Sequence, residues 1–460
     1  MPNYAKADLK PLNTIEIGKQ FLGFYLEHDY ISIPGSSLLD PSVPMSFVMS
    51  AGLVQVETSA QAYNGLKGQR YALIQNCFRY FDLENIGISN THLSLFQMAG
   101  AFTFGEVNHQ QMVEQIWELL TKRYLLPPEK LWVTYFSGDT VSEHQFEADA
   151  ATYEAWCRVG MPPERLVGLG ATDNFWKQGT SVVGERDAPK CGPNTEVFFD
   201  RGSHLSCGPQ CRPGCRCGRF VELMNTLLIT QHIDDQTGKV SPLEDPFTES
   251  VLGLERLAML LQKVESIYQI DSIVPLLEMV SDLVTEVSLP EAERLEQVRI
   301  LVDHLRALLY LVADGAPPPG RGGRARLMRK LVREMLTAQI VLGITSSSLY
   351  PEIVEQILEL EPRQADHLRA AKIRLCDMIE VEQECFERTI RSGKRRLRRI
   401  LKRSNENLLD GEEVVALEKH YGMPLPLLEM LLRNQQASYN VKDYERAYTD
   451  WRLKAVQSHT

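Results

Sequence analysis

Hydrophobic and polar positions divide the chain into two regions with different periodicities. Up to about residue 255, short apolar runs alternate with turn residues. Three of these runs, 46–50, 70–74 and 131–136, are bounded by Gly, Pro or Asp and predict β-strands. Residues 110–123 show helical spacing and end shortly before a Pro-Pro pair. This region therefore predicts a mixed α+β fold with a largely antiparallel sheet.

After about residue 272 the apolar residues recur at helical spacing instead. The first such segment covers 273–287, and a Pro-Pro-Pro-Gly run at 317–320 is the clearest break. Further helices are expected at 295–313, 326–342, 350–360, 364–391 and 412–420. We therefore expect an α+β domain over 1–255 and an all-α domain over 256–460.

Length and composition exclude several classes of protein. A chain of 460 residues is too long for one compact core, and 44% hydrophobic with 24% charged residues is typical of a globular protein. No apolar run approaches the ~18 residues that span a bilayer, and the start has no stretch of signal-peptide type. We expect a cytoplasmic protein without a membrane partner.

The net charge is negative, but two segments are strongly basic. The chain has 49 basic and 60 acidic residues, for a net charge of −11, yet residues 388–403 contain nine Lys or Arg and 321–333 contain six. Either segment alone is explained by a solvated helix face, whereas two in an acidic chain favour contact with a phosphate backbone. The candidate RNA-binding residues are Arg324, Arg329, Arg395, Arg396, Arg398 and Arg399.

Four of the nine cysteines lie close together in a Gly- and Pro-rich segment, 204–217: Cys207, Cys211, Cys215 and Cys217. In a reducing compartment such a cluster is more often a metal site than a set of disulfides. Four thiolates can hold one tetrahedral Zn²⁺ in a closed, structural site. Disulfides and free thiols remain alternatives, and His204 could replace one cysteine as a ligand.

The common nucleotide-binding motifs are absent, but five separated blocks occur in a defined order. The chain lacks G-x-x-x-x-G-K-[ST], G-x-G-x-x-G after a strand, and G-x-S-x-G. The blocks are S-S-L-L-D-P at 36–41, Q-N-C-F-R-Y-F-D-L-E-N-I-G at 75–87, D-N-F-W at 173–176, R-F-V-E-L-M-N at 219–225 and G-L-E-R at 253–256. Together they resemble the three signature motifs of class II aminoacyl-tRNA synthetases, in particular the alanyl-tRNA synthetase family. The resemblance extends through V-D-H-L-R at 302–306 and H-Y-G-M-P at 420–424.

The resemblance implies ATP-dependent formation of an aminoacyl-adenylate and its transfer to tRNA. A carboxylate attacks the α-phosphate, so positive charge must stabilise an anionic transition state. By resemblance, Arg79 would hold the α-phosphate, Arg256 would bind ATP from the other side, and Mg²⁺ would bridge the phosphates. Phe96 would stack on adenine, and Glu84 would belong to the same site. The alternatives are a surface ion pair for Arg79 and a core aromatic for Phe96.

The amino-acid pocket departs from the family pattern. Trp176 and Asn225 match the family's pocket residues. The family's D-T-G-M-G-L-E-R is E-S-V-L-G-L-E-R here, so Glu249 replaces the Asp that would pair with the substrate ammonium and Val251 replaces a Gly. Likewise, C-G-P-C-S-E becomes C-G-P-N-T-E at 191–196. These changes indicate altered amino-acid choice or lineage drift, with alanine expected first and glycine or a non-standard small amino acid next.

The sequence of the helical region bears on which molecule accepts the activated amino acid. In the family this domain binds the acceptor stem and uses an Asn in a P-S-N-E-G-R-G-like turn, whereas residues 313–324 here contain no Asn. We therefore expect phosphate contacts with weak sequence selectivity, and neither an editing domain nor a C-terminal oligomerisation module. Three hypotheses remain open: an alanine–tRNA ligase type of enzyme, a paralogue that delivers the adenylate to a carrier protein or a small amine, and a non-catalytic RNA-binding protein.

Overall fold

The computed structural model describes residues 11–40, 56, 67–105, 107–178, 189–234, 237–284, 289–346, 348–403 and 407–457. The chain forms two compact units, Met1–Leu83 with Ser89–Val274, and Glu84–Ile88 with Pro275–Thr460. The main division therefore falls at 274/275 rather than at the expected 255/256. The reason is that α6 (Leu254–Leu261) packs against β3 and β10 of the sheet. The expected strand 46–50, and the last residue of the first motif block, lie outside the described residues.

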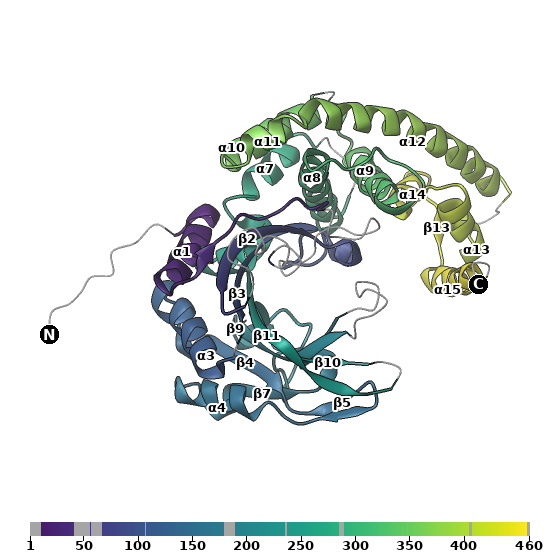
Figure 1. The fold of residues 1–460 in the computed structure, drawn as a ribbon. Coiled ribbons are helices and arrows are strands. Elements are labelled where there is room, and N and C mark those ends of the chain that lie inside the picture. The colour runs from purple at the N-terminus through teal and green to yellow at the C-terminus, as the bar shows by residue number, and fades with distance from the viewer. Residues whose placement is uncertain are drawn as a thin grey trace. The chain divides into compact units, whose positions relative to one another are not determined.

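The first unit is built on a nine-stranded mixed sheet among the described residues (Figure 1). In pairing order its main strands are β1 (Ile31–Ser32), β2 (Arg70–Phe78), β3 (Leu95–Phe104), β11 (Val240–Gly253), β10 (Phe220–Ile233), β9 (Lys190–Asp200), β4 (Leu131–Phe136) and β7 (Leu166–Leu169), with β8 (Phe175–Lys177) paired to β9. All pairs are antiparallel except β1 with β2 and β4 with β7. The antiparallel sheet and the α+β class are thus as predicted, as are the strands at 70–74 and 131–136.

Helices cover one face of this sheet. The first, α1 (Thr14–Glu27), begins at a capping box between Asn13 and Glu16. The predicted helix 110–123 is α3 (His109–Glu118) followed by one π-helical turn (Leu119–Arg123). Tyr30, which follows α1, donates through its hydroxyl to Gln115 of α3 at 3.0 Å and lies 2.9 Å from the Thr103 hydroxyl of β3. Among the described residues, this unit also contains α4 (Ala150–Arg158), α5 (Ala171–Asn174) and the hairpin of β5 (Asp139–Val141) with β6 (His144–Phe146).

The opposite face of the sheet carries both an apolar cluster and an open region. Because side chains alternate along a strand, Phe102, Leu227 and Phe247 share this face with Asn225 and Val251. The first three belong to a buried cluster that fills one end of the face. The other end carries shorter and polar side chains, among them Val251 and Asn225, and forms the floor of the candidate site described below.

The second unit is predominantly helical. Its helices are α7 (Val274–Asp282), α8 (Glu291–Ala313), α9 (Gly323–Val341), α10 (Leu349–Leu360), α11 (Ala365–Arg369), α12 (Lys372–Leu401), α13 (Gly411–Val415), α14 (Leu425–Arg433) and α15 (Val441–Gln457). Two short strands, β12 (Leu408–Leu409) and β13 (Ser438–Tyr439), pair in parallel. The helix predicted at 364–391 is in fact two helices, and α12 continues through the basic segment. Its buried stripe continues there through Ile390, Gly393, Leu397 and Ile400, and at Gly393 a Cβ would lie 2.5 Å from the Met423 Cε, so Met423 packs directly against the helix. Within the described residues, no helix is long and apolar enough to cross a bilayer.

A charged triad centred on the buried His304 joins α8 to α9. His304 is 1% exposed; its Nδ1 lies 3.0 Å from the Asp303 carboxylate and its Nε2 lies 2.9 Å from that of Glu334. Burial alone would lower the pKa of His304, but the two carboxylates outweigh it and raise the pKa to about 9. The imidazolium is therefore the form present at neutral pH.

Candidate active site

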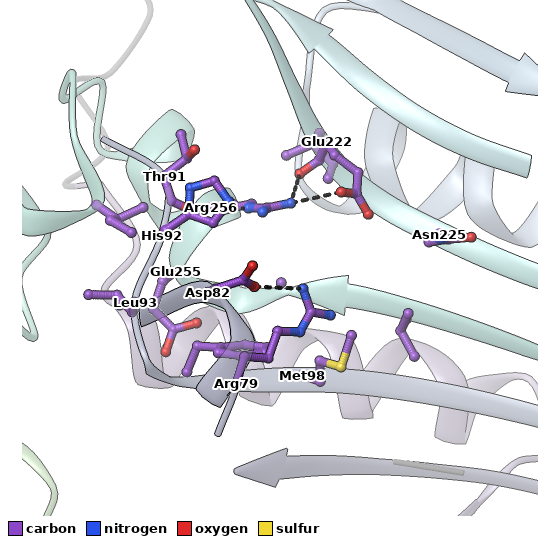
Figure 2. A pocket seen from close by; sticks show the side chains of 15 residues that line it. Arg79, Asp82, Thr91, His92, Leu93, Met98, Glu222, Asn225, Glu255 and Arg256 are labelled. Carbon is purple, nitrogen blue, oxygen red and sulfur yellow. Dashed lines mark hydrogen bonds and ion pairs between the residues drawn. The ribbon is translucent and has the colours of Figure 1, made fainter. Parts of the chain in front are cut away.

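A hollow with about 670 Å³ of empty space opens on the polar end of the sheet face (Figure 2). It is lined by residues of three strands (β3, β10 and β11), of α6, and of the segment 79–93 between β2 and β3, together with Ile267. Among them are Arg79, Phe96, Asn225, Val251 and Arg256. The structure thus brings together five of the residues that the motif blocks had suggested, all within the first unit.

Arg79 directly follows β2, and its backbone N–H donates to Ser94 O at 3.0 Å. This bond places Arg79 beside β3, where its guanidinium lies 5.0 Å from the ring centre of Phe96. The same guanidinium lies 4.0 Å from the carboxylate of Asp82 (Figure 2). Arg79 therefore presents its positive charge to the hollow while covering the Phe96 ring.

Arg256 lies in the first turn of α6, after the N-terminal Gly253. Its Nη1 donates to the Glu222 carboxylate at 3.0 Å and to the Glu222 carbonyl at 3.3 Å, and its Nε donates to Thr91 O at 3.4 Å. Burial and the Arg256 charge lower the pKa of the neighbouring His92, which is consequently neutral. A second guanidinium is thereby held at the opposite side of the hollow (Figure 2).

A row of cross-strand neighbours crosses the sheet beneath the hollow. Gly100, Val251, Asn225, Glu196 and Thr134 are direct partners on β3, β11, β10, β9 and β4. Direct partners point to the same face and lie about 5 Å apart. The Asn225 Nδ2 donates to Glu196 Oε1 at 3.1 Å, and the Thr134 hydroxyl donates to Glu196 Oε2 at 3.4 Å.

Two residues of the C-G-P-N-T-E block contact Asn225: Glu196 from the same row, and Asn194 from the next row, where its partner is Leu227. Asn194 is 4% exposed, and its Nδ2 donates to the Asn225 Oδ1 at 3.1 Å. Burial, with a further contribution from Glu222, raises the pKa of Glu196 to about 8. The sequence flagged this block as a departure from the family, but it did not identify Asn194 and Glu196 as neighbours of Asn225. The missing information was the register between β9 and β10.

Three candidate site residues lie elsewhere. Glu249 is 3% exposed and sits one row deeper, between its cross-strand partners Phe102 and Leu227. Trp176 packs against the apolar cluster that contains Phe102 and Leu227. Glu84 is exposed and belongs to the segment 84–88 of the second unit. None of the three lines the hollow.

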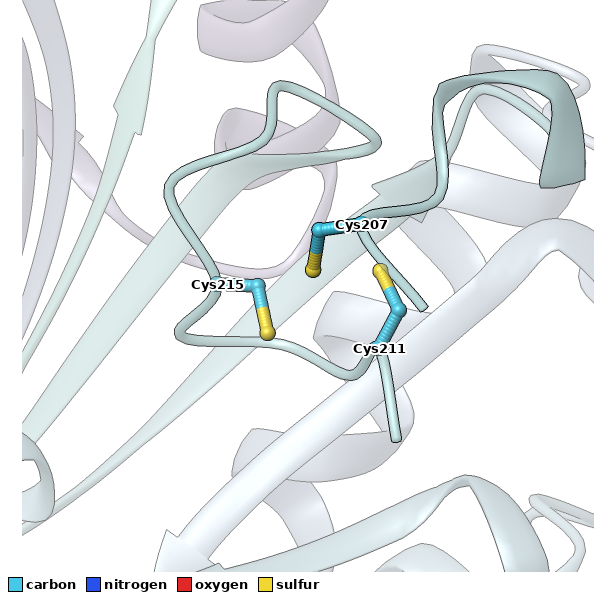
Figure 3. A group of neighbouring side chains, drawn as sticks. All are labelled: Cys207, Cys211 and Cys215. Atoms are coloured by element: carbon cyan, nitrogen blue, oxygen red, sulfur yellow. The ribbon is translucent and has the colours of Figure 1, made fainter. Parts of the chain in front are cut away.

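The cysteine segment forms the connection between β9 and β10. The sulfur atoms of Cys207, Cys211 and Cys215 lie within 4.8 Å of one another and point toward a common centre (Figure 3). The Cys217 sulfur lies 3.5 Å from that of Cys211, and none of the four is in a disulfide. His204 is not part of this group; its ring packs against Gly202.

An ion pair closes the base of this connection. Arg219 donates through Nε and Nη2 to the two carboxylate oxygens of Asp200, at 2.8 and 2.6 Å. Such a bidentate pair fixes both ends of the loop, because Asp200 ends β9 and Arg219 precedes β10. The loop geometry is therefore set by its anchor as well as by its cysteines.

The basic segment of α12 presents one charged face. Phe386, Ile390, Leu397 and Ile400 are buried, whereas Arg395, Arg398 and Arg399 are exposed. Arg396 is half-buried, with its Nε enclosed by protein. The candidate residues of the other basic segment are less available: Arg324 is half-buried, and Arg329 lies 3.5 Å from the buried carboxylate of Glu382.

Comparisons with known proteins identify the family. Residues 16–460 match the model for tRNA synthetases class II (A). The alanine–tRNA ligase of Alkaliphilus metalliredigens (strain QYMF) is 30% identical over 98% of this chain and 50% of its own length. That of Alkaliphilus oremlandii (strain OhILAs) is 31% identical over 97% of this chain and 49% of its own. The solved structure of apo S. aureus histidyl-tRNA synthetase is 12% identical, covering 67% of this chain and 81% of its own, with a TM-score of 0.33.

The chain spans about half the length of the curated relatives that it matches. The family model, by contrast, covers nearly all of it, including the hollow, the cysteine segment and the second unit. The chain belongs to the tRNA synthetases class II (A) family.

Proposed function

We propose that this chain activates a small amino acid, alanine in first place, with ATP and transfers it to a tRNA. The observation that carries the proposal is the convergence of two arginines, an aromatic ring and Asn225 in one hollow on an antiparallel sheet. The relatives named alanine–tRNA ligase support alanine as the amino acid. Glycine or a non-standard small amino acid is the alternative, because the pocket row carries Val251 in place of the family's Gly.

The two arginines supply the charge that the reaction requires. Arg79 and Arg256 approach the hollow from different elements, so a triphosphate between them would meet positive charge on two sides. Donors that are already in place stabilise a developing anionic centre without reorganisation. Phe96 offers a ring face for adenine once the Arg79 guanidinium turns from it to the phosphate.

The donor set at the rim of the hollow fits Mg²⁺. Asp82 and Glu222 place carboxylate oxygens beside the two arginines, and oxygen ligands are those that Mg²⁺ prefers. These two residues would hold the ion together with the nucleotide phosphates. When bound, Mg²⁺ supplies further charge neutralisation at the phosphates.

The cysteine segment fits one structural Zn²⁺. With Zn–S bonds of about 2.3 Å, tetrahedral sulfurs lie about 3.8 Å apart. The observed separations, 3.5 Å for one pair and at most 4.8 Å within the trio, are close to this value. Cys207, Cys211, Cys215 and Cys217 would hold the ion in the reducing cytoplasm, where we place the protein. The ion would stiffen the connection that leads into β10 and Asn225.

The helical unit supplies the surface for the RNA. Arg395, Arg398 and Arg399 form an exposed face that suits the phosphates of an acceptor stem. This face favours an RNA acceptor over a carrier protein or a small amine. Arg329 contributes less, because Glu382 already pairs with it.

ATP–pyrophosphate exchange against the twenty amino acids tests the proposal. Alanine should support exchange without tRNA, and Arg79→Ala should lower the rate roughly 10²–10³-fold, as expected for the loss of one transition-state donor. Arg158→Ala is the matched control, because Arg158 of α4 makes exposed contacts with Glu154 and Gln110 and does not line the hollow. Absence of exchange with every amino acid, or full activity of Arg79→Ala, would overturn the assignment.

A further inference from the structure

We infer that Glu196, rather than Glu249, is the carboxyl group that binds the ammonium of the amino acid, and that Asn194 and Asn225 position it. The inference rests on the proposed function and deepens it. It concerns the first half of the reaction only, in which the amino acid must be oriented before its carboxylate attacks ATP.

Glu249 is poorly placed for this contact. It is 3% exposed and its cross-strand partners are Phe102 and Leu227. The Phe102 ring also folds over Gly100, where a Cβ would lie 2.7 Å from it. The row of Gly100 and Val251, over which the Phe102 ring folds, thus separates Glu249 from the hollow.

Glu196 is better placed. Like Glu249 it does not itself line the hollow, but it is only half-buried and is the direct cross-strand neighbour of Asn225, which does. Its oxygens accept one hydrogen bond each, from Asn225 at 3.1 Å and Thr134 at 3.4 Å. A carboxylate has about four acceptor positions, so capacity remains for an ammonium donor.

The charges around the hollow would also orient a bound amino acid with its ammonium toward Glu196. Glu222 and Asp173 add negative charge near Glu196. Arg79 lies on the other side of the hollow, beside Phe96 of β3. An amino acid would therefore place its ammonium toward Glu196 and its carboxylate toward Arg79 and the α-phosphate.

Asn194 helps to position Glu196 for binding the ammonium in this chain. Its side-chain amide donates to the Asn225 Oδ1, which turns the Asn225 Nδ2 toward Glu196. Asn194 is in turn held by Asn174, whose Nδ2 donates to the Asn194 carbonyl at 3.1 Å and to the Thr134 hydroxyl at 3.0 Å. A cysteine at 194, as in the C-G-P-C-S-E pattern, would offer only a weak donor. The replacement of the family's Cys by Asn194 on β9 thus accompanies the replacement of its Asp by Glu249 on β11.

The test separates the KM for the amino acid from the KM for ATP in pyrophosphate exchange. At about pH 8.5, where most of Glu196 is ionised, Glu196→Gln should raise the KM for alanine roughly 10–100-fold, the loss expected for a hydrogen bond between charged groups, with the KM for ATP within twofold of wild type. Glu196→Asp should recover part of the loss, and Asn194→Cys should fall between wild type and Glu196→Gln. Glu249→Gln is the matched control and should change the KM for alanine less than threefold.

Two inhibitors make the assignment specific to the ammonium. Alaninol keeps the ammonium and lacks the carboxylate, so its inhibition should weaken in Glu196→Gln by the same factor as the KM for alanine. Lactate carries a hydroxyl in place of the ammonium and should inhibit both proteins equally. An unchanged alanine KM in Glu196→Gln, or a larger effect of Glu249→Gln, overturns this inference alone. A wild-type protein that exchanges with no amino acid overturns the proposed function instead.

Discussion

The KM for the amino acid should depend on pH through Glu196. Burial and the Glu222 charge raise the pKa of this carboxyl group to about 8, whereas the Thr134 hydroxyl and Arg256 act in the opposite direction and Asp173 adds to the increase. With Asn225, these are the polar and charged groups that face it from β4, β10, α5 and α6. Below that pKa the group is protonated, and it must lose its proton to pair with an ammonium.

The magnitude follows from the ionised fraction. With a pKa of about 8, roughly 3% of Glu196 is ionised at about pH 6.5 and roughly three quarters at about pH 8.5. The KM for alanine should therefore fall about 25-fold over this range, which corresponds to about 2 kcal/mol of binding free energy. The direction is tighter binding with rising pH, because the ionised form is the one that binds.

The assay is pyrophosphate exchange at a series of pH values, with the KM for ATP measured in parallel. Glu196→Gln should show a weak and nearly flat KM for alanine over the same range. His92 does not interfere, since its lowered pKa keeps it neutral here. A wild-type KM that is independent of pH, or a pH dependence that persists in Glu196→Gln, would refute the reasoning.

The remaining predictions concern metal, RNA and stability. Protein purified without chelator should contain one zinc per chain, and Cys215→Ser with Cys217→Ser should abolish it; zinc-free but fully stable wild-type protein would contradict the site. Arg395→Gln with Arg399→Gln should flatten the plot of log affinity for tRNA against log salt by roughly 0.7–0.9 per lost phosphate contact, and an unchanged slope would exclude this face. The pKa of His304 is raised to about 9, so its stabilisation is complete below its unfolded-state pKa of about 6.5 and is lost as the pH rises through about 9. Urea unfolding should show this decline, and His304→Gln should not.

Local patterns made much of the fold predictable. The strands at 70–74 and 131–136 have clear turn residues at their ends, and the helices of the second unit have regular apolar spacing. The extent of α12 was underestimated, although Ile390, Leu397 and Ile400 continue its buried stripe at helical spacing. Gly393 occupies one position of that stripe without an apolar side chain, and Met423, from a later part of the chain, packs there instead.

Site residues with a role of their own were predictable from the sequence, whereas contacts between residues on different strands were not. Arg79 and Arg256 belong to motif blocks whose chemistry is evident from residue type, and the family resemblance also pointed to Phe96. The pairing of Glu196 with Asn225 depends on a register that shifts between Glu222 and Met224, which one sequence does not reveal. The burial of Glu249 likewise depends on partners from two other strands.

The arginines of the hollow are engaged with acids before any nucleotide arrives, and this has a consequence for ATP binding. Arg79 faces Asp82 and Arg256 holds Glu222, so a triphosphate displaces carboxylates and does not meet bare cations. Binding is then an exchange of ionic partners, and the affinity should respond to salt less than two unpaired guanidiniums would imply. The displaced carboxylates are left facing phosphate oxygens, which is unfavourable unless a divalent cation lies between them. Under the proposed function, the site would in this way select the metal complex of ATP over the free nucleotide.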